Sequence, residues 1–322
     1  MPSVSVALCT RNGAAHVRQQ LESIARQRVA QADWVVSDDD SSDDTLAFVA
    51  DASAALPHDV RILRNDPPLG VTANFEQAMA ATTGDLIALS DQDDVWHPDK
   101  LSRMVAEFDR RPALLLLASD ARLVDADGVP TGELLLDTLY VSADDRARIH
   151  AGGAWDVQLR RNVLTGATML LRRELLDLAR PFPASWVHDE WLATIAAAVG
   201  EVDVLEEPLI DYRQHGGNQI GAESLGLAGR MRRLREPRDA RNARLLARAR
   251  ALAERLPALP GVSPERAGHA RDKLAHEQAR SALPASRLRR IAPVLREWRT
   301  GRYARHGLGA QDILRDLVQP VG

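Results

Sequence analysis

Apolar runs and amphipathic stretches alternate along the first part of the chain. Short runs dominated by valine, isoleucine, leucine and alanine predict buried strands, at residues 4–8, 34–37, 60–63, 86–89 and 114–118. Between them, apolar residues recur every three or four positions, which predicts helices over residues 14–27, 45–54, 71–81 and 99–109. This alternation predicts an α/β fold with a mostly parallel, doubly wound sheet.

The pattern becomes weaker after the fifth run. Residues 120–124 and the following Asp127-Gly128 predict a strand that turns back, whereas residues 131–160 have no clear period and predict a mobile loop. Further elements are predicted as strands at 164–171 and 202–205 and helices at 173–178 and 191–199. From residue 222 the pattern is helical and rich in arginine, with breaks near 256–264 and at Pro284. We therefore expect one domain over residues 1–221 and a basic, mainly helical extension over residues 222–322.

Charge is divided unevenly between these two parts. The 322 residues carry a net charge of −4, but residues 222–322 hold 22 basic and 10 acidic side chains, and the rest hold 19 and 35. The two parts are therefore suited to different partners. No apolar run of about 18 residues is present, so no membrane span is expected, and the first residues lack the basic start of a signal peptide. Cys9 is the only cysteine, which excludes an intrachain disulfide and makes the cytoplasm the default location.

Three acids follow the run at 86–89 within four residues: Asp91, Asp93 and Asp94. Like charges held this close repel one another, so the arrangement is typical of a place where a cation neutralises them. Mg²⁺ and Mn²⁺ prefer oxygen ligands and bind through one or two carboxylates together with the phosphates of a substrate. A lone Asp-x-Asp is more often a solvated acidic turn. The preceding strand and the following Trp96 and Lys100 favour a metal–diphosphate site.

Polar motifs also follow the first two predicted strands. Thr10-Arg11-Asn12-Gly13 comes after the first and Asp38-Asp39-Asp40-Ser41 after the second. In doubly wound sheets ligands bind outside the carboxyl ends of the strands, so we expect these motifs to lie near the acidic cluster. Residues 42–45 are explained as the cap of the next helix. A carboxylate at the strand end, Asp38 or Asp39, can instead accept the imide N–H of uracil or thymine.

Taken in order, these motifs resemble those of family 2 glycosyltransferases, which have the Rossmann-like GT-A fold. The resemblance covers roughly residues 3–221 and also rests on Gly70–Phe75, Thr165–Ala167, His188–Trp191 and Tyr212–Asn218. The Asp-Gln-Asp-Asp-Val-Trp, His-Asp-x-Trp and Tyr-Arg-Gln-His-Gly motifs are similar to those of a bacterial rhamnosyltransferase-like branch. That branch acts in polysaccharide biosynthesis, including O-antigen and other cell-envelope glycans.

The resemblance implies roles for residues at the first two strand ends. Thr10 and Arg11 would line the nucleotide pocket, Asp39 would contact the base, and Asn74 would lie near the nucleotide or the sugar. The sequence departs from the family at two positions. A tyrosine is usual at position 11, so base stacking would here fall to the Arg11 guanidinium. A glycine is frequent at position 40, where Asp40 makes the turn sterically more demanding.

The resemblance also implies a metal and a catalytic base. Asp93 would ligate the Mn²⁺ or Mg²⁺ that holds the donor diphosphate, with Asp91 at the ribose or near the metal, and His215 would reach the metal or the diphosphate. Asp189 corresponds to the base, with Glu190 in reserve, although one of the two is also expected to cap the following helix. Three residues are implied for the acceptor or sugar region: Thr165, Gly166 and Trp191.

These roles imply an inverting, metal-dependent transfer of a sugar to a glycan or lipid-linked glycan. The first expectation for the donor is dTDP-L-rhamnose, and the second is a UDP-hexose. Two other functions are less consistent with the sequence. A non-catalytic nucleotide-binding or scaffold subunit of a polysaccharide assembly complex is disfavoured by the intact acids. A sugar nucleotidylyltransferase usually has a Gly-rich loop after the first strand, and the loop here is too short for one.

Two apolar stripes run through the basic extension, each among arginines. The first, from Leu245 to Leu256, predicts a helix packed on the first domain with a solvated arginine face. The second, from Leu288 to Trp298, has the composition of an interfacial helix that attracts anionic lipid, which suits an enzyme at the inner face of the cell membrane. No nucleic-acid motif or aromatic interleaving accompanies the arginines, so nucleic acid is not an expected partner.

Overall fold

A computed structural model describes residues 1–54, 59–215 and 237–320. Contacts group the chain into two compact units. Unit 1 comprises residues 1–154 and 163–222, and unit 2 comprises residues 155–162 and 223–322. The division near residue 222 lies where the sequence pattern changes. Residues 155–162 group with the C-terminal helices, which no sequence pattern indicated.

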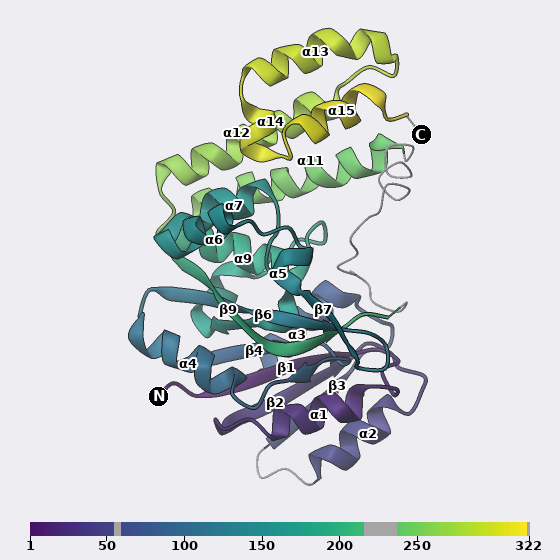
Figure 1. The fold of residues 1–322 in the computed structure, drawn as a ribbon, viewed down its shortest axis with the longest axis vertical. Helices are drawn as coiled ribbons and strands as arrows, with labels where there is room; N and C mark the ends of the chain where they lie inside the picture. Colours follow the sequence, from purple (N-terminus) through teal and green to yellow (C-terminus); the bar gives the residue numbers. More distant parts are fainter. Residues whose placement is uncertain (55–58, 216–236, 321–322) are drawn as a thin grey trace. The chain divides into compact units, whose positions relative to one another are not determined.

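Unit 1 is built on a mixed sheet with the strand order β3-β2-β1-β4-β8-β6-β9-β5, and β7 pairs with β6 (Figure 1). Strands β1 to β4 pair in parallel, as do β6 and β9, whereas β5, β7 and β8 pair antiparallel. The strands are β1 (Val4–Thr10), β2 (Gln31–Asp38), β3 (Asp59–Arg64), β4 (Leu86–Ser90), β5 (Val95–Trp96), β6 (Leu114–Val124), β7 (Pro130–Leu134), β8 (Met169–Arg172) and β9 (Glu201–Arg213).

Helices of unit 1 lie on both faces of this sheet (Figure 1). Residues such as Leu21, Val49 and Met104 belong to the same buried cluster as Val6 and Trp34 of the sheet, so α1, α2 and α4 cover one face. On the other face α3 contacts β1 and β2 and packs against α9. The helices are α1 (Val17–Ala25), α2 (Thr45–Ser53), α3 (Val71–Ala81), α4 (Lys100–Arg110), α5 (Leu135–Thr138), α6 (Ala143–Arg148), α8 (Arg173–Ala179) and α9 (His188–Val199).

The expected loop over residues 131–160 is wrong. This segment forms β7, α5, α6, a π-helical turn (Ile149–Gly153) and α7 (Ala154–Arg160). The elements are too short for a periodic pattern to build up. One local signal was present: Ser142 Oγ accepts from Asp145 N, and the Asp145 side chain accepts from the Ser142 backbone, which is a capping box.

Several predicted boundaries also change. The two runs at 114–118 and 120–124 join into the single strand β6, and the strand expected from 164 begins only at Met169, because Gly166–Thr168 form a 3-10 turn. Helix α9 starts at His188, three residues early, so the acids at 189 and 190 lie in its first turn. Strand β9 continues to Arg213. The full length of this strand was not predicted, since Glu206-Glu207-Pro208 interrupts the apolar pattern.

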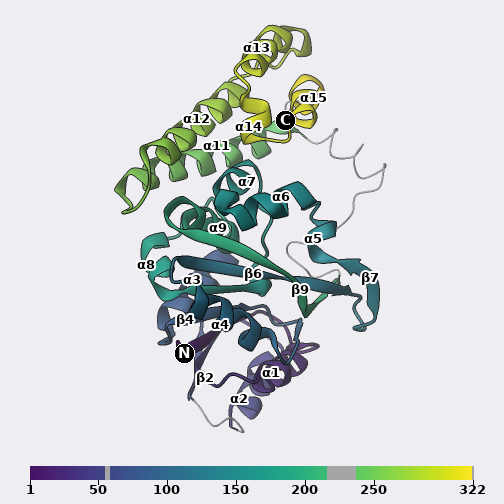
Figure 2. The same ribbon diagram turned by 60° about the vertical axis from the view of Figure 1, so that its left-hand side comes forward.

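Unit 2 consists of helices around α11 and α12, which pack against each other. In Figures 1 and 2, α13 lies on the side of this unit opposite α11. Residues 155–162 are tied to α12, since Lys273 Nζ donates to Leu159 O at 2.6 Å and Trp155 Nε1 to His269 Nδ1 at 3.3 Å. The helices are α11 (Arg238–Arg255), α12 (Pro264–Ser281), α13 (Arg287–Arg299), α14 (Arg302–His306) and α15 (Ala310–Val318), with a 3-10 turn at Leu256–Ala258.

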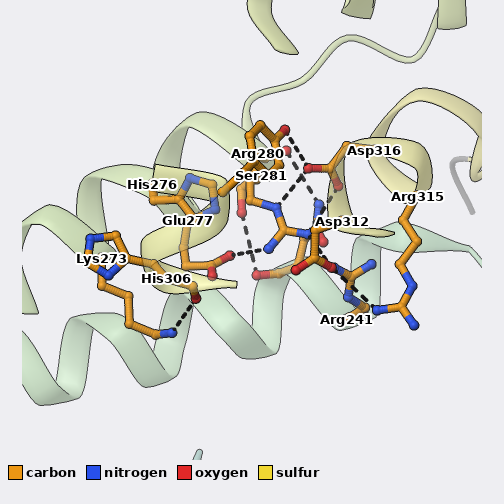
Figure 3. Close-up of polar contacts among 12 residues, drawn as sticks. Arg241, Lys273, His276, Glu277, Arg280, Ser281, His306, Asp312, Arg315 and Asp316 are labelled. Atoms are coloured by element: carbon orange, nitrogen blue, oxygen red, sulfur yellow. Dashed lines mark hydrogen bonds and ion pairs between the residues drawn. The ribbon is translucent and has the colours of Figure 1, made fainter. Parts of the chain in front are cut away.

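The interior of unit 2 contains a small apolar cluster. Beside it lies a group of buried charged side chains (Figure 3). Arg280 is buried, and its Nε donates to Asp316 Oδ2 at 2.8 Å. Arg280 also pairs with Glu277 and Asp312, each at 3.4 Å, and Tyr303 Oη donates to Asp316 Oδ2 at 2.8 Å. Buried charges are tolerated when they are paired in this way. The apolar cluster is Leu283, Val294 and Tyr303.

The helices that the structure describes in both units are too short or too polar to be membrane-spanning segments. None of those in residues 1–54, 59–215 and 237–320 has both the length and the apolar composition needed to cross a bilayer.

Candidate active site

Three strand ends meet at one edge of the sheet in unit 1. Thr10 at the end of β1 pairs with Asp38 at the end of β2, and Leu8 pairs with Ser90 at the end of β4. The loops that follow carry residues 11–13, 39–41 and 91–94. The expected convergence of the three polar motifs is confirmed, because parallel neighbours in this register end at the same edge.

Asp38 holds the turn that follows β2. Its carboxylate is buried and accepts hydrogen bonds from Thr10 Oγ1 at 2.7 Å and from Ser41 N at 2.9 Å. Asp40 has a φ of 65°, in the left-handed region that glycine adopts most easily. The steric demand expected from an aspartate at position 40 is therefore present. Thr10 is buried as well, and its contact with a nucleotide stays a prediction.

Asp39 and Asn74 position the loop that leads into α3. Asp39 is buried and accepts from the backbone N–H groups of Leu69 at 2.6 Å and Gly70 at 2.9 Å. Asn74 Nδ2 donates to Ser37 O at 3.0 Å, which ties α3 to the end of β2. Both residues thus lie beside the strand ends, as expected. Their contacts with a base or sugar stay predictions.

Gln92 connects the first loop to the acidic loop, a role that sequence reasoning missed. Its Oε1 accepts from Arg11 N at 2.8 Å, and its Nε2 donates to Arg11 O at 3.0 Å. A Cβ at Gly13 would lie 2.1 Å from Gln92 Oε1, so a larger residue at position 13 would displace the Gln92 side chain from this contact. The Arg11 side chain is exposed beside the acidic loop, where it can reach a ligand.

The acidic cluster comprises Asp91, Asp93 and Asp94, with Asp189 nearby. Burial raises the pKa of Asp91 to about 7, and the charges of Asp93 and Asp189 add to this shift. Burial also raises the pKa of Asp94, and again neighbouring carboxylates contribute. Asp94 Oδ1 accepts from Arg213 N at 3.0 Å, while Oδ2 has no hydrogen-bond partner among the described residues. With all of these carboxylates ionised the cluster would carry a surplus of negative charge, and the raised pKa values show that this state is unfavourable without a further cation.

Two basic side chains that were assigned no role from the sequence lie at this cluster. Lys100 is fully buried, its Nζ donates to Ala167 O at 2.7 Å, and burial lowers its pKa to about 7 against the opposing effect of Asp94 and Asp91. Arg213 at the end of β9 donates through Nε to Asp93 O at 2.8 Å. Lys100 follows the acidic motif directly in the sequence, which was the available signal. Lysines are usually exposed at the surface, so the burial of Lys100 was not expected.

The two predicted metal ligands lie together. His215 Nε2 lies 2.8 Å from Asp93 Oδ2, and the ring of His16 stacks on that of His215 with centroids 5.3 Å apart. The glycines and the asparagine that follow His215 in its motif, at 216–218, lie outside the described residues. In the described part of the chain, no three acidic, histidine or cysteine side chains could enclose a metal ion by themselves. The surplus negative charge and the unpartnered Asp94 oxygen fit a divalent cation that shares its coordination with phosphates.

Asp189 and Glu190 lie in the first turn of α9, where the helix dipole favours a negative charge. Asp189 is buried, and its Oδ2 accepts from Gly166 N at 3.1 Å. Its Oδ1 accepts from Glu190 N at 2.6 Å. The electrostatic effect of Asp189 on Asp91 places this carboxylate beside the acidic cluster. Glu190 is less buried than Asp189, and the assignment of the base to Asp189, with Glu190 in reserve, stays a prediction.

His188 lies between the proposed base and α3 and was not predicted to have a role. Its ring is buried and stacked on Phe75, with centroids 3.9 Å apart. Neither ring nitrogen has a hydrogen-bond partner within the described part of the chain, and burial lowers its pKa. Trp191 is fully buried and donates through Nε1 to Ala179 O at 2.8 Å. It therefore belongs to the core beneath the site, while Gly166 contacts Asp189 directly.

The family model described as glycosyl transferase family 2 matches residues 5–176. The chain belongs to this family. An uncharacterised protein of Mycobacterium tuberculosis (strain H37Rv) is 27% identical over 215 residues, which cover 66% of the chain and 59% of the relative. The chain thus spans 59% of the length of this relative. A dTDP-rhamnosyl transferase of Shigella flexneri is 25% identical over 232 residues, which cover 67% of the chain and 74% of the relative.

Solved structures share the fold at low sequence identity. Residues 1–349 of TarS from Staphylococcus aureus, in complex with UDP-GlcNAc, align with a TM-score of 0.59 and 17% identity, covering 98% of the chain and 89% of that fragment. A mannosyltransferase of Pyrobaculum calidifontis in complex with GDP-Man and Mn²⁺ aligns with a TM-score of 0.54 and 18% identity, covering 98% and 86%. These likenesses confirm the expected GT-A-like fold.

Proposed function

We propose that this protein is an inverting, metal-dependent glycosyltransferase that uses a nucleoside-diphosphate sugar. The observation that carries the proposal is the acidic cluster at the meeting point of three strand ends, with Asp189 beside it. Family membership supports it, as do the relatives that are named as glycosyltransferases. Asp93 and His215 would hold a divalent cation, with Asp91 as an alternative ligand.

In this proposal each residue of the site has a separate role in binding or catalysis. Arg11 reaches the donor from the exposed side of the site, and Asp39 keeps the loop before α3 in place for the base. Asp189 takes the proton of the acceptor hydroxyl while the new bond forms at the anomeric carbon. When bound, the cation supplies charge stabilisation for the leaving diphosphate. Gly166 N–H donates to the Asp189 carboxylate and so helps to orient it.

The donor and the acceptor are the finer part of the proposal. The Shigella relative is named as a dTDP-rhamnosyl transferase, which supports dTDP-L-rhamnose as donor ahead of a UDP-hexose. The acceptor would be a glycan or a lipid-linked glycan of the cell surface, and the protein would act at the inner face of the cell membrane. TarS in complex with UDP-GlcNAc and the Pyrobaculum enzyme in complex with GDP-Man and Mn²⁺ share the fold and are consistent with this class of donor.

Calorimetry with dTDP and UDP, each with and without Mn²⁺, tests the diphosphate site. We expect Mn²⁺-dependent binding of one nucleotide over the other, and roughly 100-fold weaker binding for Asp93→Asn. Asp109→Asn, at an exposed position of α4, removes the same charge elsewhere and should bind as the wild type does. Failure of both nucleotides to bind would contradict the proposal.

Asp189→Asn tests the reaction itself. We expect unchanged diphosphate binding and a loss of turnover of about 10²- to 10⁴-fold, because the acceptor loses its base. The release of nucleoside diphosphate from the sugar nucleotide measures turnover, with water as acceptor when no glycan is supplied. Near-normal turnover would move the base to Glu190 or overturn the assignment. Tight donor binding by a wild-type protein without turnover would favour the scaffold function.

A further inference from the structure

Most of the large apolar side chains of helix α13 point away from the interior of unit 2. Four large apolar side chains are exposed along it: Leu288 (81%), Ile291 (46%), Leu295 (46%) and Trp298 (55%). At 100° per residue they fall within a sector of roughly 80°, so they form one stripe along the helix. We call this the α13 stripe. In most surface helices of globular proteins such a stripe faces the core.

The side of α13 that faces the interior is partly polar. Arg290, Val294 and Glu297 are buried there. Arg290 Nη1 donates to Gln319 O at 2.6 Å, and Glu297 Oε1 lies 2.7 Å from His276 Nδ1. Rotating the helix to bury the α13 stripe would leave these buried polar partners unpaired, which is costly. The outward direction of the stripe is therefore fixed by the fold of unit 2.

Arginines border the α13 stripe on both sides. At 100° per residue, Arg287 follows one margin and Arg289, Arg296 and Arg299 follow the other, and all four are exposed. The acid of this helix, Glu297, is buried and paired. Exposed aliphatic and tryptophan side chains between arginines are typical of a helix that lies in the headgroup region of an anionic bilayer. The arginine stems can lie along the apolar surface while the guanidinium groups reach lipid phosphates.

A second copy of this chain fits the α13 stripe less well. A two-fold contact through α13 would place the four arginines of one copy against the same arginines of the other. Like charges brought together at an interface oppose association. An anionic lipid surface offers both an apolar layer for the stripe and negative charge for its margins.

We propose that the exposed face of α13 is a membrane-docking surface that binds anionic lipid, with the helix lying parallel to the bilayer. This deepens the proposed function, since it names the surface that brings the protein to a lipid-linked acceptor. The biological role of this surface rests on the proposed function, whereas its binding to lipid is measured without donor or acceptor. Diphosphate binding by the same preparation then tests the catalytic proposal separately.

Co-sedimentation of the full chain with lipid vesicles tests the apolar part of this surface. The vesicles are phosphatidylcholine with about one third phosphatidylglycerol, or phosphatidylcholine alone. We expect the double variant Leu295→Ser, Trp298→Ser to bind the anionic vesicles roughly 30-fold more weakly, from partial loss of two buried apolar side chains. Val129→Ser, at an exposed valine of unit 1, is the matched control and should bind as the wild type does.

The charged margin is tested by Arg289→Gln with Arg296→Gln. Each arginine near an anionic surface strengthens binding about fivefold, so the pair should lose roughly 25-fold on anionic vesicles and little on phosphatidylcholine. Arg244→Gln with Arg250→Gln, at exposed positions of α11, makes the same change in net charge and should have a much smaller effect. All of the substituted residues are exposed, so circular dichroism and melting temperature should match the wild type.

Three results would overturn the proposal. The first is failure of the wild type to bind anionic vesicles, and the second is an equal loss of binding in the α13 and control variants. The third is a dimer in sedimentation velocity that Leu295→Ser with Trp298→Ser dissociates, which would assign the stripe to a second copy of the chain. Wild-type diphosphate binding in any of these cases would leave the proposed catalytic function standing.

Discussion

Replacing Gly166 with alanine adds one methyl group next to the proposed base. A Cβ at this position would lie 2.8 Å from His188 Nε2 and 3.3 Å from Asp189 Cβ. The backbone belongs to the 3-10 turn Gly166–Thr168, a conformation that alanine adopts without strain. The effect of the substitution is therefore steric, and it acts on the contact between residue 166 and the first turn of α9.

The size of the effect follows from these distances. Non-bonded heavy atoms normally lie at least about 3.5 Å apart, so the backbone at 166 or the His188 ring has to move by roughly 0.7 Å. The ring is buried and stacked on Phe75, which prevents it from retreating. Overpacking of this kind costs about 1–3 kcal/mol. The same movement weakens the bond from residue 166 N–H to Asp189, and misplacement of a base by up to 1 Å lowers turnover by up to about 100-fold.

The assay compares turnover, donor binding and stability in one variant. For Gly166→Ala we expect nucleoside diphosphate release to fall roughly 10- to 100-fold, with diphosphate affinity nearly unchanged. The melting temperature of unit 1 should fall by about 2–4 °C for each kcal/mol lost. Gly268→Ala is the matched control, because a Cβ there meets only Arg271 Nη2, at 3.9 Å, inside α12. It should stabilise unit 2 by about 0.5–1 kcal/mol and leave turnover unchanged.

Wild-type turnover in Gly166→Ala would refute the claim that residue 166 positions the base. An equal loss of diphosphate affinity and turnover would instead place this turn in donor binding. A loss in turnover that Gly268→Ala shares would show that the assay reports general stability.

Three further predictions concern charged groups. Lys100→Met removes the buried ammonium beside the acids, so added Mn²⁺ should raise the melting temperature of this variant by more than that of the wild type. Mn²⁺ affinity should fall by up to about tenfold per pH unit below pH 7, because the proton that Asp91 takes up with a pKa of about 7 competes with the cation. Calorimetry at pH 5.5 to 7.5 measures this affinity, and an affinity that does not change with pH would contradict the prediction. Arg280→Met should lower the free energy of unfolding of unit 2 by about 3–5 kcal/mol, because buried Asp316 loses its cation, whereas Arg315→Met, at a less buried position, should cost less than about 1 kcal/mol in the same denaturant melts.

The strands near the site were predictable because each is a short apolar run bounded by polar residues. Strand β1 and helix α3 lie where the pattern placed them, and the residues at the ends of β1, β2 and β4 meet because parallel pairing in register brings them to one edge. The full length of β9 was not predictable. Its course past Glu206 is fixed by pairing with β6 through two irregular steps, and long-range pairing leaves no local signal in the sequence.

The acidic residues of the site could be predicted from the sequence, whereas the side chains that contact them could not. The spacing of Asp91 and Asp93 indicates a binding site, since carboxylates held close together at a strand end need a cation. Lys100 and Arg213 look like ordinary surface side chains in the sequence, and only the packing of α4 and β9 around the acidic loop buries them. His188 was assigned no role for a similar reason, because its stacking on Phe75 joins segments far apart in the chain.

The direction of the α13 stripe shows why an amphipathic pattern alone does not locate the core. The sequence predicts a stripe and an arginine-rich remainder, and either side could have faced inward. The interior of unit 2 decides the matter, because it already contains Asp316, His276 and other polar partners that bind Arg290 and Glu297. A polar interior therefore takes the polar side of α13 and leaves its leucines and Trp298 outside. Exposed apolar surface of this kind persists in proteins where a partner covers it, and the bordering arginines make an anionic membrane the partner that best matches its charge.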